Sequence, residues 1–399
     1  MPWPGCDLVP RFPDISPYAH AVSHRVYSTL AERAKVKNDV VYPLHVGDTY
    51  RDPIAVARAE RQLSSEHAGL HRYAPVQGEP ELIEAFLEFV ARRHAVSLDR
   101  DCVQVMSGAT PGLNVVTQVL LEPGDEVLLP SPFWPLSRGV IATKGAVPVQ
   151  IPFYTRLDEP DFDAEALLER NVTERTVALY INTPNNPTGR VVPEQVVDAM
   201  FRVAKRHDLW VLCDEAYEEI YFGQTAPKAV WKHPDVRDRA IVFHTLSKTF
   251  GLAGARVGFT HGPKSVMIAI RGMQTFQTYC APRPMQFGAI QALRHGAPWV
   301  AESRAHYEAA GRKAASALGV PAPDGGTFLF ADVSALLRPD EQDCMPLLER
   351  CADRGVLITP GSSCGEHYAR WIRLCFTAVP PTQLDEALER IAPLFRAPS

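Results

Sequence analysis

Residues 240–258 read AIVFHTLSKTFGLAGARVG, and this stretch decides the fold. It opens with a short apolar run, AIVFH, which is typical of a buried strand. A turn of hydroxyl residues follows and carries Lys248, and a glycine-rich segment then leads to Arg256. In an open α/β sheet, ligands bind beyond the carboxyl ends of the strands. The stretch therefore predicts a strand of such a sheet, with a ligand-binding loop at its end.

Similar apolar runs alternate with helical patterns on both sides of this stretch. Short apolar strands that alternate with helices favour a mostly parallel sheet with both faces covered. We therefore expect an α/β fold with one seven-stranded, mostly parallel sheet covered by helices. Six further strands are predicted at residues 102–106, 126–129, 149–151, 176–181, 209–213 and 257–261, and helices at residues 80–93, 111–121, 135–144 and 193–207.

The remaining segments predict a smaller α+β domain. We expect residues 1–49 to form a proline-rich arm and part of this domain, residues 50–295 to form the large domain, and residues 296–399 to complete the small one. The elements expected outside the large sheet are helical regions at residues 21–34, 284–317 and 381–395, and strands at residues 40–46, 327–332, 356–358 and 371–376.

The composition of the 399 residues is that of an ordinary folded protein, with 46% hydrophobic and 22% charged residues. A net charge of −5 and scattered basic residues argue against nucleic-acid binding. No apolar run is long enough to span a membrane, and the N-terminal residues lack the pattern of a secretory signal. The eight cysteines are dispersed, so we expect reduced thiols in a cytoplasmic protein and no metal site.

Polar or glycine-containing turns follow the predicted strands, at the edge where their carboxyl ends meet. The turn SGAT, residues 107–110, precedes a helix whose free N–H groups suit a phosphate. Trp134 follows another strand, and Asn186 lies in the turn NTPNNPTG. Asp214 and Tyr217 belong to the segment DEAY after the strand LWVLC. Taken one at a time, these residues also fit ordinary caps, polar turns and core aromatic side chains.

Three charged residues give these strand ends a specific chemistry. A carboxylate such as Asp214 is costly to place after a buried strand without a cationic partner, which a protonated pyridine nitrogen would supply. Lys248 acts as a Schiff-base nucleophile only if a desolvated, cationic neighbourhood lowers its pKa. Arg256, eight residues later, suits a bidentate contact with a phosphate.

The motifs SGAT, PFW, NTPNNPTG, DEAY and SKTFGLAGARVG, in this order, resemble the class I and II aminotransferases of the aspartate aminotransferase superfamily. Those enzymes are fold-type-I transferases that use pyridoxal 5′-phosphate (PLP). The run WIRLCF, residues 371–376, resembles the strand that carries the substrate arginine of the family. The resemblance extends from about Tyr73 to the C-terminus and includes Gly47. It implies a homodimeric transaminase of amino acid metabolism with shared active sites.

The resemblance also implies a role for each matching residue around the cofactor ring. Lys248 would form the Schiff base, or internal aldimine, and would move the proton between substrate and cofactor. Asp214 would pair with the pyridine N–H, and Tyr217 and Asn186 would hydrogen-bond the phenolic oxygen. Trp134 would stack on the ring. We therefore expect Lys248, Asp214 and Tyr217 to be the catalytic residues.

The same resemblance implies where the phosphate and the substrate bind. Arg373 would hold the substrate α-carboxylate in a two-pronged contact. Gly47 would lie against the substrate, which Asn186 would also contact. The phosphate would be bound by Gly108, Ala109, Thr110, Thr245, Ser247 and Arg256, and by Tyr73 from the neighbouring subunit.

The segment LHVGDTYRDP, residues 44–53, departs from the pattern of the family, in which this loop shapes the side-chain pocket. With Tyr50, Phe328 and Trp134 expected nearby, an aromatic or other bulky apolar substrate is favoured over aspartate. Arg283 lies near the region where members that act on acidic substrates place a second arginine, but it also fits a surface or interface residue.

Other functions remain to be distinguished from transamination. A PLP-dependent carbon–sulfur β-lyase would also need Lys248, Asp214 and Arg373, and would expel a β-substituent. A non-catalytic regulator with this fold is disfavoured because every expected catalytic residue is present. A dinucleotide-binding enzyme is disfavoured because no GxGxxG motif follows a first strand. We therefore expect transfer of an amino group from an L-amino acid to a 2-oxo acid by a ping-pong mechanism.

Overall fold

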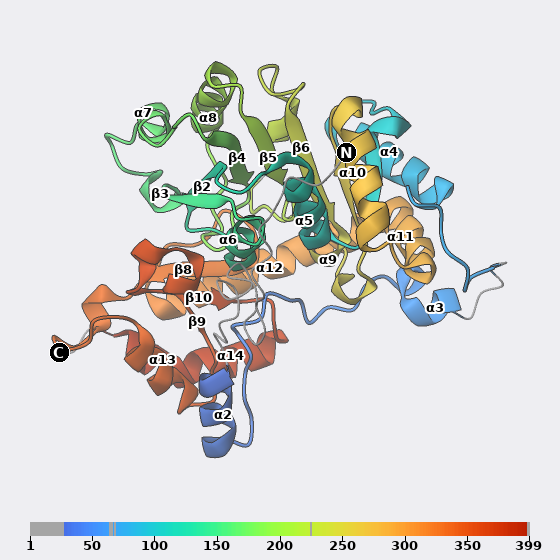
Figure 1. Cartoon of the computed structure of the whole chain (residues 1–399). Coiled ribbons are helices and arrows are strands. Elements are labelled where there is room, and N and C mark those ends of the chain that lie inside the picture. The colour runs from blue at the N-terminus through green and yellow to red at the C-terminus, as the bar shows by residue number, and fades with distance from the viewer. Residues whose placement is uncertain (1–27, 64–66, 68, 224–225, 397–399) are drawn as a thin grey trace, which may run out of the picture.

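The computed structural model describes residues 28–63, 67, 69–223 and 226–396. The larger sheet and its helices occupy the upper part of the molecule in Figure 1, and a smaller sheet with α2, α13 and α14 lies below. The predicted proline-rich arm lies outside the described residues. None of the helices within those ranges is long and apolar enough to cross a membrane.

The larger sheet has seven strands in the order β1-β7-β6-β5-β4-β2-β3. Strand β7 runs antiparallel to both of its neighbours, and the other six strands run in one direction. The predicted mostly parallel seven-stranded sheet is therefore confirmed. The strands are β1 (Val103–Met106), β2 (Glu126–Ser131), β3 (Val147–Pro152), β4 (Thr176–Asn182), β5 (Trp210–Asp214), β6 (Ala240–Thr245) and β7 (Gly258–His261).

Successive side chains of each strand pack into two different cores, because they point to opposite faces of the sheet. In β4, Leu179 and Ile181 pack into one core, whereas Ala178 and Tyr180 pack into the other. Both faces are thus covered by helices, as a parallel sheet requires. The first core includes α4 (Pro80–His94), α7 (Ala164–Glu169), α8 (Glu194–Arg206) and α11 (Arg283–His295), and the second includes α5 (Ala109–Leu120), α6 (Pro135–Ala142) and α10 (Lys264–Gln277).

The smaller sheet is antiparallel and surrounds a separate core. Helix α12 (Ala297–Leu318) joins the two parts: Trp299 near its start packs against the large sheet, and Tyr307 and Leu318 pack into the small core. In Figure 1, α12 runs between the two sheets. The small core includes residues of β8 (Phe328–Asp332), β10 (Trp371–Cys375), α2 (Ser28–Lys37), α13 (Met345–Ala352) and α14 (Pro381–Ile391), and β9 (Thr359–Pro360) pairs with β10.

Some predicted elements differ from the structure. The strand expected at residues 40–46 is wrong: only Tyr42 forms an isolated bridge, to Val356, since Pro43 has no N–H group with which to extend a ladder. The strand expected at residues 356–358 is displaced to Thr359–Pro360. The helical region 284–317 is two helices that meet at Gly296. Of the helix expected at residues 21–34, residues 28–37 form α2, and residues 21–27 lie outside the described part.

The strand directions bring the expected ligand-binding residues to one edge of the large sheet. Strands β1, β4, β5 and β6 run in the same direction and end at Met106, Asn182, Asp214 and Thr245. Asn182 lies directly opposite Asp214 in the sheet. The short helix α9 (Leu246–Thr249) follows β6 immediately and carries Lys248 at the same edge.

Candidate active site

A cavity of about 160 Å³ lies at this edge. Apart from Ala216 and Ala253, every residue that lines it was assigned to the site from the sequence. Gly47, Gly108 and Arg373 do not line the cavity, but each contacts a residue that does. The lining consists of Ala109, Thr110, Trp134, Asn186, Asp214, Ala216, Tyr217, Thr245, Ser247, Lys248, Ala253 and Arg256.

Asp214 ends β5 and places its carboxylate at the cavity wall. The Tyr180 hydroxyl donates to Oδ2 at 2.5 Å, and the Ala216 backbone N–H donates to Oδ1 at 3.1 Å. Burial raises the pKa of this carboxyl group, and the hydrogen bond from Tyr180 opposes that shift. Among the described residues, no lysine or arginine forms an ion pair with Asp214. The carboxylate therefore fits a cationic group of a ligand.

Lys248 lies across the cavity with its ammonium group turned toward the segment before Tyr50. Its Nζ donates to the backbone carbonyl of Gly47 at 2.5 Å. Burial lowers the pKa of Lys248, while the charge of Asp48 raises it. A Cβ atom on Gly47 would lie 2.7 Å from Cζ of Phe328, so only glycine allows this close approach of the backbone. Lys248 thus has the partly desolvated position that a nucleophilic amine needs.

The far side of the cavity is built for an anion. Gly108 precedes helix α5 with φ of 104°, and a Cβ atom there would lie 2.7 Å from Nη2 of Arg256. Arg256 donates from Nη1 to the carbonyl of Ala253 at 3.0 Å and forms no ion pair with an acidic residue in the described part of the chain. Thr245 Oγ1 donates to Ser247 Oγ at 2.9 Å. A helix N-terminus, two hydroxyl groups and a guanidinium together suit a phosphate.

Arg373 on β10 brings the small sheet to the cavity. Its Nη1 donates to Asn186 Oδ1 at 3.2 Å, and its Nη2 donates to the carbonyl of His45 at 3.2 Å and to Thr359 Oγ1 at 3.4 Å. The guanidinium lies 4.5 Å from the centre of the Phe328 ring. The side chain is buried, and its Nε has no hydrogen-bond partner among the described residues. A buried guanidinium without an acidic partner fits the carboxylate of a ligand.

Two aromatic residues complete the lining. The buried ring of Tyr217 makes an edge contact with Phe328, at 6.2 Å between ring centres, and burial raises the pKa of its hydroxyl. Trp134 caps helix α6, and its carbonyl accepts a hydrogen bond from Ser137 Oγ at 2.7 Å. This bond fixes the turn that carries the half-buried Trp134 ring at the cavity.

Tyr73 and Arg283 lie away from the cavity. The Tyr73 side chain is 79% exposed, and its ring leans on that of Tyr279 at 4.9 Å. Arg283 Nε donates to Glu79 at 2.6 Å, and its Nη1 donates to the Gly69 carbonyl. Arg283 is thus neutralised within its own chain.

Arg51, in the segment of residues 44–53, also lies outside the cavity lining. Its guanidinium pairs with Glu302 on α12 at 2.9 Å and lies 5.6 Å from the centre of the Trp299 ring. Tyr50 donates its backbone N–H to the carbonyl of Thr377, beyond β10. These contacts attach the loop to the small sheet and to α12.

A larger cavity of about 880 Å³ lies elsewhere, between α8 and the residues that follow β5. Its charged side chains have partners: Lys228 pairs with Glu194 at 2.5 Å, His233 pairs with Asp198 at 3.2 Å, and Arg93 pairs with Glu219 outside the lining. No residue assigned to the site from the sequence lines this cavity. Size alone therefore does not single out the candidate site, whereas Asp214 and Arg373, which form no ion pair among the described residues, favour the smaller cavity.

Sequence reasoning missed a buried polar network behind the cavity. Glu218, just after Tyr217, accepts from His244 at 2.6 Å and pairs with His94 at 3.0 Å, and His244 contacts His261 at 3.1 Å. Burial would raise the pKa of the Glu218 carboxyl group, but its contacts with His244 and His94 lower that pKa. Tyr180 was also missed, because a tyrosine within the apolar run TVALYI has the appearance of a core residue.

The arrangement can hold one elongated ligand with three distinct groups. A cationic ring atom fits Asp214, a carbonyl group fits the amine of Lys248, and a phosphate fits Arg256 and the start of α5. PLP has these three groups, and the carboxylate of an amino acid, as a second ligand, fits Arg373. The residues present therefore fit the cofactor that the sequence predicts.

Comparison with known proteins gives one family over most of the chain. Residues 40–391 match the family described as aminotransferase class I and II. The aspartate/prephenate aminotransferase of Thermus thermophilus is 31% identical over 359 residues, 85% of this chain and 87% of that protein. The arginine–pyruvate transaminase of Pseudomonas aeruginosa is 31% identical over 360 residues, 88% of each chain. A mutant of Thermus thermophilus aspartate aminotransferase matches with a TM-score of 0.84 at 27% identity, over 95% of this chain and 99% of that one.

Proposed function

Because the chain belongs to the class I and II aminotransferases, we propose that it transfers the amino group of an L-amino acid with an aromatic or other bulky apolar side chain to a 2-oxo acid. Membership of the family makes it a PLP-dependent transaminase of fold type I, as the sequence predicted. The observation that carries the substrate proposal is the contact between Arg373 and Phe328. The guanidinium would bind the α-carboxylate, next to an aromatic wall.

Substrate binding would depend on the two sheets together. Arg373 belongs to the small sheet, and its partner Asn186 lies in a loop after β4 of the large sheet. Both residues are buried, so a carboxylate that binds them is withdrawn from water and makes strong charge-assisted hydrogen bonds. The backbone of Gly47 and the ring of Phe328 limit the space beside them. Together these residues would fix the substrate Cα near the amine of Lys248.

Lys248 would move the proton of the reaction. When bound, PLP supplies an electron sink and accepts the amino group. Burial lowers the pKa of Lys248, which favours the neutral amine that can take a proton from the substrate Cα. Its Nζ donates to the Gly47 carbonyl at 2.5 Å, and this hydrogen bond holds the amine at the cavity. Asp214 would hold a proton on the ring nitrogen, with its Oδ2 oriented by Tyr180.

The substrate proposal predicts a preference among amino donors. We expect kcat/KM for L-phenylalanine to exceed that for L-aspartate by about tenfold or more, because burial of an aromatic side chain contributes roughly 1.5–3 kcal/mol and a second carboxylate would be left unpaired. Half-reactions with L-phenylalanine, L-tyrosine, L-leucine, L-aspartate and L-arginine, followed by cofactor absorbance, measure this preference. Equal or faster reaction with L-aspartate or L-arginine would contradict it.

The same assay separates transamination from β-elimination. A transaminase converts the bound cofactor in a single turnover and releases one 2-oxo acid per site. A carbon–sulfur β-lyase given an S-substituted L-cysteine would instead release pyruvate and ammonia without converting the cofactor. We expect stoichiometric conversion and no excess of ammonia.

We also propose a homodimer in which Tyr73 serves the active site of the partner. Tyr73 contacts Tyr279 with 4.9 Å between ring centres, and Phe276 lies three residues before Tyr279; the three are 79%, 44% and 90% exposed, in the order Tyr73, Tyr279, Phe276. Exposed aromatic side chains that gather in one region are typical of an interface. Because Tyr73 does not line the cavity of its own chain, its hydroxyl is available to a phosphate bound in a second copy.

Replacing Tyr73 by phenylalanine tests this arrangement. The dissociation constant of PLP should rise about tenfold to hundredfold, because one hydrogen bond to a charged group contributes roughly 1.5–3 kcal/mol. Mixed dimers of Tyr73→Phe with Lys248→Ala should regain one tight PLP site per dimer, in which Lys248 and Tyr73 come from different subunits. If mixing the two variants restored no tight PLP site, or if a monomer had full activity, the shared site would be contradicted.

A further inference from the structure

The loop that presents Asn186 is closed by its own hydrogen bonds. The Asn185 backbone N–H donates to the Arg190 carbonyl at 2.8 Å, and the Gly189 N–H donates to the Asn185 carbonyl at 2.8 Å. The Asn185 side chain accepts from the backbone and hydroxyl of Thr188, at 3.1 and 2.8 Å. The loop is therefore a compact unit, and its orientation depends on what holds it from outside.

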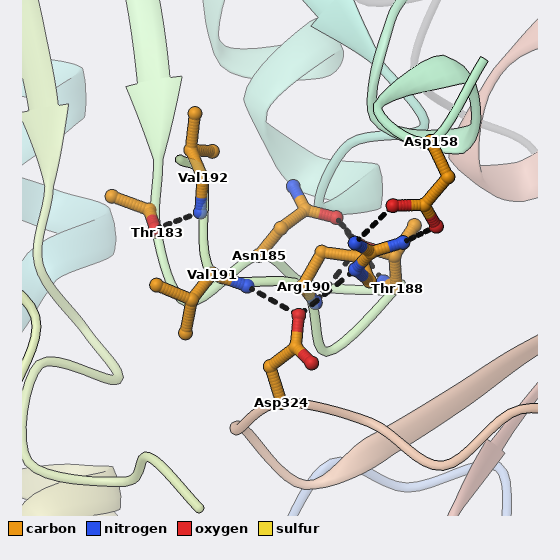
Figure 2. Close-up of polar contacts among 8 residues, drawn as sticks. All are labelled: Asp158, Thr183, Asn185, Thr188, Arg190, Val191, Val192 and Asp324. Atoms are coloured by element: carbon orange, nitrogen blue, oxygen red, sulfur yellow. Dashed lines mark hydrogen bonds and ion pairs between the residues drawn. The ribbon is translucent and has the colours of Figure 1, made fainter. Parts of the chain in front are cut away.

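Arg190 holds this loop from outside, through contacts with two other segments of the chain. Figure 2 shows its guanidinium between Asp158 and Asp324, which come from two other segments of the chain. Nη1 and Nη2 donate to the two oxygens of Asp158 at 2.5 and 2.9 Å, and Nε donates to Asp324 Oδ2 at 2.8 Å. The same Asp324 oxygen accepts from the Val191 N–H at 3.2 Å. One side chain thus connects three segments through a planar fork, which a lysine could not reproduce.

Asp324 extends the connection to the small sheet. Its backbone N–H and that of Gly325 donate to the Gly189 carbonyl, at 2.9 and 2.8 Å. Its carbonyl accepts from the Phe222 N–H at 2.7 Å. The segment then continues directly into β8, which begins at Phe328, the ring that lies against Arg373. Arg190 therefore fixes the Asn186 loop and the start of β8 relative to one another.

Asn186 connects the loop that Arg190 holds to the residues of the candidate active site. Its backbone N–H donates to Asn182 Oδ1 at 2.7 Å, and Asn182 donates in turn to the Asp214 carbonyl at 2.9 Å. Its Oδ1 accepts from Arg373 at 3.2 Å. We propose that Arg190 is a positioning residue for transamination, which holds Asn186 and Phe328 so that Arg373 is oriented toward the substrate carboxylate. The proposal rests on the substrate role given above to Arg373.

Replacement of Arg190 by glutamine tests the proposal, with Arg206→Gln as the matched control. Arg206 also pairs with two acids, Glu165 and Glu169, but lies on α8 away from the loop. In Arg190→Gln, the KM values for L-phenylalanine and for 2-oxoglutarate should both rise about tenfold, with kcat changed less than twofold. Loss of binding that is equal in the ground and transition states changes KM alone. Arg206→Gln should leave both constants unchanged.

Hydrogen exchange gives a second readout that does not depend on turnover. Amide protection in a peptide covering residues 182–191 should fall in Arg190→Gln and stay at the wild-type level in Arg206→Gln. Unchanged protection together with unchanged KM would overturn the proposal, as would a fall in kcat with KM constant. If the wild-type enzyme does not react with L-phenylalanine, the substrate proposal fails, while the exchange comparison still decides the role of Arg190.

A double-mutant cycle with Asp324 distinguishes loss of the Arg190–Asp324 contact from a general loss of stability. Asp324→Asn keeps an oxygen that can accept from Val191 but removes the charge that pairs with Arg190. If the Arg190–Asp324 contact is responsible for the rise in KM, the double variant Arg190→Gln with Asp324→Asn should show the same KM as Arg190→Gln alone. Fully additive effects of the two substitutions on KM would overturn the proposal.

Discussion

Replacement of Lys248 by alanine is expected to lower kcat by at least about 10⁴-fold. The substitution removes both the amine that would link covalently to PLP and the base that would move the proton, and base catalysis alone contributes roughly 10²–10⁴-fold. The cofactor should still bind, because Asp214, Arg256 and the start of α5 are retained. Steady-state rates and the mass of the borohydride-reduced protein measure the two losses separately.

Lys264→Ala is the control for this substitution. Lys264 is an exposed lysine that pairs with Asp101 at 2.5 Å, remote from the cavity lining. The Lys264→Ala variant should retain wild-type activity, and after borohydride reduction its mass should still increase by that of one cofactor. If Lys248→Ala kept more than about one per cent of wild-type kcat, or still gained the cofactor mass on reduction, another lysine would carry the chemistry.

Replacement of Asp214 by asparagine should lower kcat/KM by about two to three and a half orders of magnitude. Removing one partner of a buried ion pair costs about 3–5 kcal/mol, and each 1.4 kcal/mol corresponds to a factor of ten. Asparagine can still accept the hydrogen bond from Tyr180 but cannot balance a protonated ring nitrogen. Single-turnover rates with an amino donor, measured at saturating cofactor, separate this effect from weaker PLP binding.

Glu215→Gln provides a neighbouring control. Glu215 is buried beside Asp214, burial raises the pKa of its carboxyl group, and its Oε1 lacks a hydrogen-bond partner among the described residues. Because burial disfavours the charged form of the Glu215 carboxyl group, replacing it by a neutral amide of the same size should leave activity within about threefold of wild type. Equal losses in the two variants would indicate that buried charge in this segment, and not Asp214 itself, is what catalysis needs.

The large sheet could be predicted because its strands are buried on both faces and therefore appear as continuous apolar runs. The strands at residues 176–181, 209–213 and 240–244 agree with the structure to within one residue at each end. Helix α10 (Lys264–Gln277) was not predicted. Val266 and Ile270 are buried, but Ile268 and Phe276 are 63% and 90% exposed, so the apolar residues do not define one face.

The cavity lining could be predicted because its residues follow strands whose ends meet at one edge. Contacts that depend on the register between strands could not be predicted. Tyr180 reaches Asp214 because β4 and β5 align Asn182 with Asp214, and the sequence alone does not specify that alignment. Arg190 follows a recognisable motif, but its partners Asp158 and Asp324 are 32 and 134 positions away. The roles of the site residues and the domain boundaries stay predictions.

The division of the site between two sheets has a consequence for how such enzymes diversify. The groups that fit the cofactor lie at the ends of β5 and β6 and at the start of α5, whereas Arg373 and Phe328 lie on the small sheet, beside the loop of residues 45–51. Mutations in that loop and in the small sheet can therefore alter which substrate is accepted while the chemistry is inherited unchanged. Relatives of similar identity that are named for aspartate, prephenate and arginine are the expected outcome of this modular arrangement.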